Sequence, residues 1–235
     1  KGAMRSGDKQ GLLSEAKMHA YGGAKELVLI AQDTTAFGED TNNKDGLADF
    51  LEKLSEAVPE VPWIRLMYAY PGKVTPKLVE TMSGLPNVVP YVDMPLQHGS
   101  DATLRRMKRP SLRKANQSLD LLTKAMPDIA LRTTFIVGFP DETESEFLEL
   151  LEFIKEWKFD HIGAFSYSPQ DGTPAFENGG SVDSAVVADR YSRLMTLAQD
   201  ISSSRTKDLV GKRVNVLIES EEPGENTEGD LFSIG

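Results

Sequence analysis

The segment TTFIVGFPDETESEF, residues 133–147, joins a buried strand to a helix and decides the fold. Its first five residues are apolar or β-branched, as is typical of a strand that is buried on both faces of a parallel sheet. Gly138 and Pro140 follow directly, and this pair favours a sharp turn. Thr143 and Glu146 have the spacing of a capping box, after which apolar residues recur at helical spacing. The segment therefore predicts a strand, a turn and a helix.

The same alternation runs along most of the chain. Strands are expected at residues 26–31, 63–68, 88–94, 130–137 and 161–167. Helices are expected from residue 44, from the Thr75 cap to Gly84, and at 111–126, 143–157 and 184–204. Strands that alternate with helices form parallel sheets, and about five strands are fewer than the eight of a closed barrel. The sequence predicts an α/β fold with an incomplete barrel or an open sheet.

Composition excludes several classes of function. The 235 residues contain no apolar run of the ~20 residues that a membrane-spanning helix needs, and the first ten residues lack the apolar segment of a signal peptide. A cytoplasmic protein is expected. The net charge of -10 disfavours bulk binding of nucleic acid. Cysteine is absent, so these residues offer no disulfide, no thiolate nucleophile and no cysteine metal site. The three histidines lack metal-ligand spacing, and no metal is expected in this chain.

The sequence pattern changes after Gly211. Residues 212–219, KRVNVLIE, alternate as a β-strand does, and an acidic segment with Gly and Pro follows them. The sequence predicts two domains, a core over residues 1–206 and the start of a small β-rich module over residues 207–235.

Polar residues follow several of the expected strands. Gln32 and Asp33 follow the first strand, Gln97 follows the third, and Tyr167 and Ser168 follow the last. Because the carboxyl ends of parallel strands meet at one rim, a site is expected there. Ordinary turns and helix caps are the alternative explanation for such residues.

Gly138 and the basic run 105–114 each allow two interpretations. The glycine either lets a flat ring lie against the backbone or only shapes the turn. The run RRMKRPSLRK carries six basic residues and is either a solvated connection between two helices or a docking patch for an acidic substrate loop or ribosomal RNA. His19 is expected to be solvated in a helix, and His161 to be structural in a buried strand.

Four ordered motifs resemble one family. AQDTTAFG (31–38), DMPLQHGSD (93–101), TTFIVGFPDET (133–143) and YSPQDGTPA (167–175) are similar to the radical S-adenosylmethionine methylthiotransferases. The first two motifs resemble the branch that modifies a ribosomal protein, the RimO type. A transfer-RNA methylthiotransferase of the same family and a non-radical small-molecule-binding α/β barrel are the alternatives.

The resemblance implies an incomplete (βα)6 radical SAM barrel followed by the start of a TRAM domain. In the family, a CxxxCxxC loop binds a [4Fe-4S] cluster, and S-adenosylmethionine supplies a 5'-deoxyadenosyl radical. That radical abstracts hydrogen from the β-carbon of an aspartate in a small-subunit ribosomal protein, where a methylthio group is added. An electron donor is a further implied partner. The chain resembles a core fragment without the N-terminal domain and the cluster loop, expected to be inactive alone.

The resemblance also implies roles for residues at the rim. Gln32 and Asp33 match the place of the motif that binds the amino group of the cofactor, and Gln97 is placed to meet the ribose. Arg132 would meet a carboxylate of cofactor or substrate, unless it forms an ordinary surface ion pair. No catalytic residue is assigned. The expected cofactor-binding set is Gln32, Asp33, Gln97, His98, Arg132, Thr134, Ile136, Gly138, Phe139, Tyr167 and Ser168.

Overall fold

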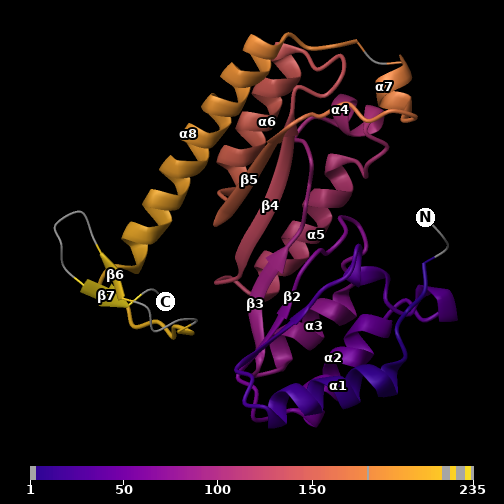
Figure 1. Cartoon of the computed structure of the whole chain (residues 1–235), viewed down its shortest axis with the longest axis vertical. Helices are drawn as coiled ribbons and strands as arrows, with labels where there is room; N and C mark the ends of the chain where they lie inside the picture. The colour runs from indigo at the N-terminus through magenta and orange to yellow at the C-terminus, as the bar shows by residue number, and fades with distance from the viewer. Residues whose placement is uncertain (1–3, 179, 219–222, 226–230, 234–235) are drawn as a thin grey trace.

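A parallel sheet of five strands forms the centre of the molecule (Figure 1). The structure is a computed structural model and describes residues 4–178, 180–218, 223–225 and 231–233. The strand order follows the chain, β1-β2-β3-β4-β5. The bounds are β1 (Glu26–Leu29), β2 (Trp63–Leu66), β3 (Val88–Asp93), β4 (Ala130–Val137) and β5 (His161–Ser166). This sheet confirms the predicted α/β fold class and all five predicted strands.

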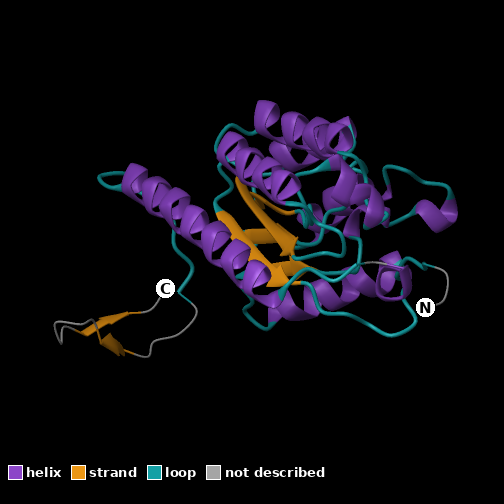
Figure 2. Cartoon of the chain, turned by 90° about the horizontal axis from the view of Figure 1, so that it is seen from above, coloured by secondary structure: helices purple, strands orange, loops and turns teal. Residues whose placement is uncertain are grey.

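Helices connect the strands and cover one face of the sheet (Figure 2). The elements between the strands are η1 (Thr34–Ala36), η2 (Glu39–Thr41), α2 (Gly46–Ala57), α3 (Pro76–Gly84), α4 (Asp101–Arg106), α5 (Leu112–Ala125) and α6 (Glu144–Trp157). Helix α1 (Lys9–Tyr21) precedes β1, and α7 (Pro174–Asn178) follows β5. The long helix α8 (Ser184–Leu209) runs beside β5 and α6. Among the described residues, no helix is both long and apolar enough to cross a membrane.

The alternation of side chains on β4 separates a packed face from an open one. Leu131, Thr133, Phe135 and Val137 are buried against the helices. Arg132, Thr134 and Ile136 point to the opposite face and keep part of their surface exposed. Because successive residues of a strand point to opposite faces, the other strands continue these two faces. The apolar core therefore lies between the sheet and its helices, and the second face of the sheet remains partly exposed.

Local signals in the sequence explain where the helices begin. Thr143 and Glu146 form the predicted capping box of α6 with both of its hydrogen bonds. Thr75 caps α3, and Pro76 occupies its first turn. The short helices α4 and α7 and the two 3-10 turns were not predicted, because elements of three to six residues carry too little periodicity to be recognised.

The predicted strand at residues 212–219 is wrong over its described part. Residues 212–218 form no strand, and Glu219 lies outside the described residues. Val214, Val216 and Ile218 are all more than half exposed, so no core and no partner strand organises this segment within the described chain. A short antiparallel hairpin, β6 (Pro223–Glu225) and β7 (Leu231–Ser233), follows it.

Candidate functional site

The rim at the carboxyl ends of the strands brings together part of the predicted set. The chain after β3 continues beside β4, where the Gln97 N–H donates to the Thr134 carbonyl at 2.9 Å and the Ile136 N–H donates to the Gln97 carbonyl at 2.9 Å. The Tyr167 N–H donates to the Val137 carbonyl at 2.8 Å, and the rings of Phe139 and Tyr167 lie 5.1 Å apart. Gln97, Thr134, Ile136, Phe139 and Tyr167 are thus neighbours.

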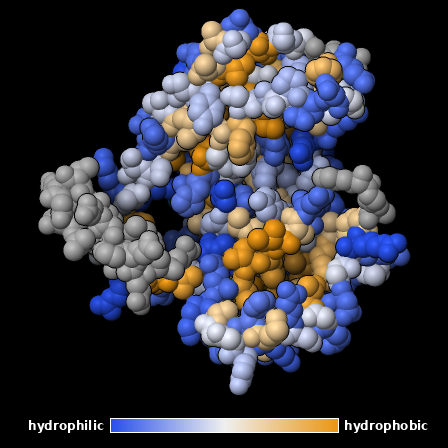
Figure 3. All heavy atoms as spheres, viewed as in Figure 1, coloured by the Kyte–Doolittle hydropathy of each residue, from blue (hydrophilic) through white to orange (hydrophobic). Residues whose placement is uncertain are grey.

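Gln32 and Asp33 lie at a second place, against a hollow of about 1010 Å³. This hollow follows the edge of β1, where Val28 and Ile30 are exposed. Figure 3 shows apolar side chains gathered in the lower half of the molecular surface in this view. The carboxylate of Asp33 accepts hydrogen bonds from the Thr35 hydroxyl at 2.5 Å and the Ala36 N–H at 3.1 Å. Its other oxygen lies 3.0 Å from Lys73 Nζ. A ligand would have to share Asp33 with these partners, whereas Gln32 is exposed.

Arg132 is an exposed cation on the open face. Its guanidinium lies 3.9 Å from Asp93 Oδ2, with 45% of the Arg132 side chain exposed and 3% of the Asp93 side chain. Burial raises the pKa of Asp93 above its ordinary value, and the Asp93 Oδ1 atom has no hydrogen-bond partner among the described residues. The pair is therefore loose, and both groups retain capacity to bind a polar ligand.

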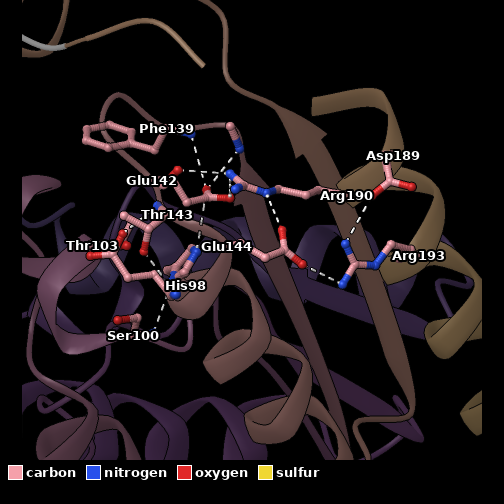
Figure 4. Close-up of polar contacts among 12 residues, drawn as sticks. His98, Ser100, Thr103, Phe139, Glu142, Thr143, Glu144, Asp189, Arg190 and Arg193 are labelled. Carbon is pink, nitrogen blue, oxygen red and sulfur yellow. Dashed lines mark hydrogen bonds and ion pairs between the residues drawn. The ribbon is translucent and has the colours of Figure 1, made fainter. Parts of the chain in front are cut away.

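The turn after β4 is held by a buried carboxylate that the sequence reading did not single out. Glu142 Oε2 accepts hydrogen bonds from the Gly138 N–H at 2.9 Å and the Phe139 N–H at 3.3 Å (Figure 4). The side chain of Glu142 is fully buried, with an exposed fraction of 0%. A buried carboxylate is stable only when charged partners and hydrogen bonds compensate its lost hydration.

That compensation comes from α8. Arg190 Nη1 donates to Glu142 Oε1 at 2.9 Å and to the Glu142 carbonyl at 3.0 Å. Arg190 is itself buried, and its Nε lies 3.3 Å from Glu144, which also binds Arg193 at 2.8 Å (Figure 4). Glu142, Arg190 and His98, which are all buried, are called the buried charge cluster below. Glu142 and Arg190 are 48 positions apart in the chain, and no local sequence pattern indicated their contact.

His98 lies beneath this turn and not on the rim surface. Its side chain is fully buried, and Nδ1 accepts a hydrogen bond from the Ser100 N–H at 3.0 Å. The ring proton is therefore assigned to Nε2, which lies 3.6 Å from Glu142 Oε2. His98 supports the turn from below. His161, by contrast, was expected in a buried position and is exposed.

Two features of the fold favour glycine at position 138. Its φ of 75° lies in the left-handed region that other residues rarely adopt. A Cβ atom built on it would also meet the side chain of Val187 on α8, with Cγ1 at 2.9 Å and Cγ2 closer still. The added side chain would therefore point at α8. The turn interpretation of Gly138 is supported, and any cofactor contact must use its backbone. Ser168 lies exposed beyond Tyr167 and does not line the hollow beside β1.

Comparison with known families matches residues 2–154 to the Radical SAM superfamily. Cofactors of this superfamily are S-adenosylmethionine and a [4Fe-4S] cluster. The first of these fits the open face, which offers an apolar wall at Ile136 and Phe139, the amide of Gln97, and the incompletely paired Arg132 and Asp93. The cluster requires thiolates, which the 235 residues do not contain.

Curated relatives match the chain over nearly its whole length. It is 46% identical over 238 residues to the protein named ribosomal protein uS12 methylthiotransferase RimO in Chloroflexus aurantiacus, covering 100% of the chain and 51% of that relative. The protein of the same name in Synechocystis is 44% identical over 226 residues, covering 95% of the chain and 50% of the relative. The chain thus spans about half the length of the curated relatives it matches.

Solved structures share the fold. Coproporphyrinogen III oxidase HemN from Escherichia coli, described as a radical SAM enzyme, superposes with a TM-score of 0.63 and 14% identity over 82% of this chain and 45% of HemN. The radical SAM methyltransferase TsrM from Kitasatospora setae gives a TM-score of 0.58 and 13% identity over 72% of this chain and 33% of TsrM. At such low identity these neighbours support the fold alone.

Proposed function

The chain belongs to the radical SAM superfamily, in the branch of the RimO-type methylthiotransferases, and we propose that it supplies the cofactor-binding rim of such an enzyme. The proposed activity is addition of a methylthio group to the β-carbon of an aspartate in ribosomal protein uS12. The single observation that carries this proposal is the 46% identity that extends over the whole chain. The rim geometry is consistent with it, because Gln97, Ile136 and Phe139 meet where the superfamily's cofactor is expected.

The proposal gives each rim residue a task. The bound cofactor would supply the radical. Ile136 and Phe139 would pack against its adenine, the backbone of Gly138 and of Tyr167–Ser168 would offer polar contacts, and Gln97 would bind the ribose. The exposed guanidinium of Arg132 would bind a carboxylate, while the unpartnered oxygen of Asp93 would accept a hydrogen bond from a hydroxyl or ammonium group. Gln32, Asp33, Thr134 and His98 remain proposed members of the set, with His98 acting through the turn that it supports.

The cluster must take its thiolates from residues other than these 235. Anaerobic reconstitution of the chain with iron and sulfide, followed by assay of both, is expected to give no stoichiometric uptake. The same chain is expected to show no turnover. Stoichiometric uptake of iron and sulfide would contradict this part of the proposal.

The activity itself is tested in cells that lack their own uS12 methylthiotransferase. The gene that encodes the chain is expressed with all of its coding sequence, and that sequence is inspected for a CxxxCxxC motif. Mass spectrometry of uS12 is expected to show the added mass of one methylthio group on an aspartate. Unmodified uS12 together with methylthiolated transfer RNA would instead assign the chain to the transfer-RNA branch.

The domain division, the partners and the compartment belong to the same proposal. Residues 1–206 would form the radical SAM core and residues 207–235 the start of a TRAM domain, supported by the end of α8 at Leu209 and the separate β6–β7 hairpin. An electron donor and the ribosome or its free protein uS12 would be partners. The cytoplasm, where ribosomes are found, is the proposed compartment.

A further inference from the structure

A small recess beside the rim has positive charge at its mouth. It has a volume of about 210 Å³ and is formed by four segments of the chain. Gln97 comes from the loop after β3, and Ile136 and Phe139 come from the end of β4 and the turn after it. Residues 106–109 come from the end of α4 and the turn after it, and residues 173–175 come from the start of α7 and the residue before it. The first two segments belong to the proposed cofactor site. The recess therefore opens next to the place where the reacting atoms of a substrate would have to lie.

Two of the cations at this recess are free to bind a ligand. The side chains of Lys108 and Arg109 are exposed, and neither forms a hydrogen bond or ion pair with any residue in the described part of the chain. Arg106 differs, because it donates two hydrogen bonds of 2.8 Å to Glu146 and one of 3.0 Å to Thr103.

The turn that carries these cations is preorganised. The Arg109 N–H donates to the Leu104 carbonyl at 2.8 Å, and the Lys108 N–H donates to the Arg105 carbonyl at 3.1 Å. Arg106 fastens the turn to Glu146, which also accepts from the Thr143 N–H at 2.8 Å at the start of α6. Because the backbone is fixed, a ligand would only have to order the two side chains, and the entropic cost of binding is reduced.

The dimensions and lining of the recess favour one carboxylate over a polyanion. About 210 Å³ is below the roughly 300–1,000 Å³ of pockets that enclose a whole drug-sized ligand, and it suits a single side chain. Ile136, Phe139, Met107 and Ala175 make much of the lining apolar, which suits the carbon atoms of an amino acid. The net charge of -10 opposes a nucleic-acid backbone far more than it opposes one carboxylate.

We propose that Lys108 and Arg109, above a floor of Gln97, Ile136 and Phe139, form a subsite that binds the side-chain carboxylate of a peptide substrate. This inference rests on the proposed function, because it places the acidic residue of the substrate next to the cofactor. The two cations hold the carboxylate by charge-assisted hydrogen bonds. The apolar walls restrict the subsite to short side chains.

Titration of the isotope-labelled 235-residue chain, followed by nuclear magnetic resonance, tests the subsite. The probes are N-acetyl-aspartate N-methylamide and its asparagine counterpart, which is nearly identical in shape but uncharged. The aspartate compound is expected to shift the amide signals of residues 107–109 and 173, and the asparagine compound is expected to bind at least tenfold more weakly. Equal binding of the two compounds, or no shift in these amides with either, overturns the proposal.

Two variants of equal charge provide the matched comparison. Lys108→Met with Arg109→Met removes both proposed ligands, while Arg105→Met with Arg113→Met removes two exposed cations of the same run that do not line the recess. The first pair is expected to weaken binding of the aspartate compound about tenfold or more, because the charge-assisted hydrogen bonds to the carboxylate are lost. The second pair is expected to leave it unchanged. Equal losses in both variants would show a general charge effect and contradict the subsite.

Further additions to the same sample separate this inference from the proposed function. S-adenosylmethionine is expected to shift the amides of Gly138 and Phe139 without displacing the aspartate compound. Displacement would assign the recess to the cofactor and overturn the subsite. No response to S-adenosylmethionine, with the aspartate response intact, would count against the proposed function alone. A short RNA that binds the turn more tightly than the aspartate compound, with loss in the Lys108→Met and Arg109→Met variant, would identify a nucleic-acid contact instead.

Discussion

The buried charge cluster and the turn that carries Lys108 and Arg109, called the basic turn here, place the same kinds of charged groups in opposite environments. In the cluster, Glu142 and Arg190 are almost completely removed from water, and each carries several hydrogen bonds. At the turn, the side chains of Lys108 and Arg109 are exposed, and neither forms a hydrogen bond or ion pair with a residue that the structure describes. A buried charge is retained in a fold only with its partners, whereas an exposed one costs little and remains available. The cluster therefore determines the shape of the rim, and the turn is free to recognise a ligand.

Replacement of Arg190 by Met is expected to have the largest effect on stability. It leaves the buried carboxylate of Glu142 without its counter-charge, and breaking a buried pair in this way costs roughly 3–5 kcal/mol. Urea unfolding measures the change in the free energy of unfolding. Arg193→Met is the control, because Arg193 and Glu144 are both substantially exposed and their ion pair is expected to contribute less than about 1 kcal/mol. Similar losses in the two variants would contradict the contrast.

Gly138→Ala is expected to cost about 2–4 kcal/mol, since it combines a left-handed backbone with a steric clash against Val187. The same substitution in a Val187→Ala background should cost only about 1 kcal/mol, because the clash is relieved while the backbone strain remains. Thermal unfolding of the four proteins in this double-mutant cycle gives the coupling free energy. Additive effects would show that Val187 does not restrict this position.

Glu146 lies between the two regions, and its contribution is expected to depend on pH. The hydrogen bonds from Arg106 are the main cause that lowers its pKa from 4.5 to about 2. Because the folded pKa is lowered, the stabilisation is present above pH 4.5 and is lost as the pH falls toward 2. Glu146→Gln is therefore expected to be about 1–2 kcal/mol less stable than the parent at neutral pH. Urea unfolding at successively lower pH should show this difference shrink, and a constant difference would contradict the prediction.

The smallest effect on stability is expected at the basic turn. Lys108→Met with Arg109→Met should change the free energy of unfolding by less than about 0.5 kcal/mol, because both side chains are exposed and form no ion pair with a described residue. Urea unfolding at neutral pH measures it. A loss of unfolding free energy comparable with that of Arg190→Met would mean that Lys108 and Arg109 stabilise the fold, which would contradict the ligand-binding interpretation.

The sequence by itself determined the layers of the fold. Apolar runs such as residues 130–137 predicted each strand, and the capping box at Thr143 and Glu146 predicted the start of α6 to the residue. These predictions were correct because strand alternation and helix capping depend on neighbours within a few positions of the chain. The same local reasoning failed at residues 212–218, since an alternating pattern becomes a strand only when a partner strand pairs with it.

Tertiary structure alone decided how the rim is held and which charges are free. Glu142 and Arg190 are 48 positions apart, and His98 reaches the same turn from the loop after β3. Nothing in the local sequence distinguishes Arg106, which is bound to Glu146, from Lys108 two residues later. The difference arises because ion pairs between distant residues depend on the distance that the folded chain sets between them, and charge composition carries no information on that distance.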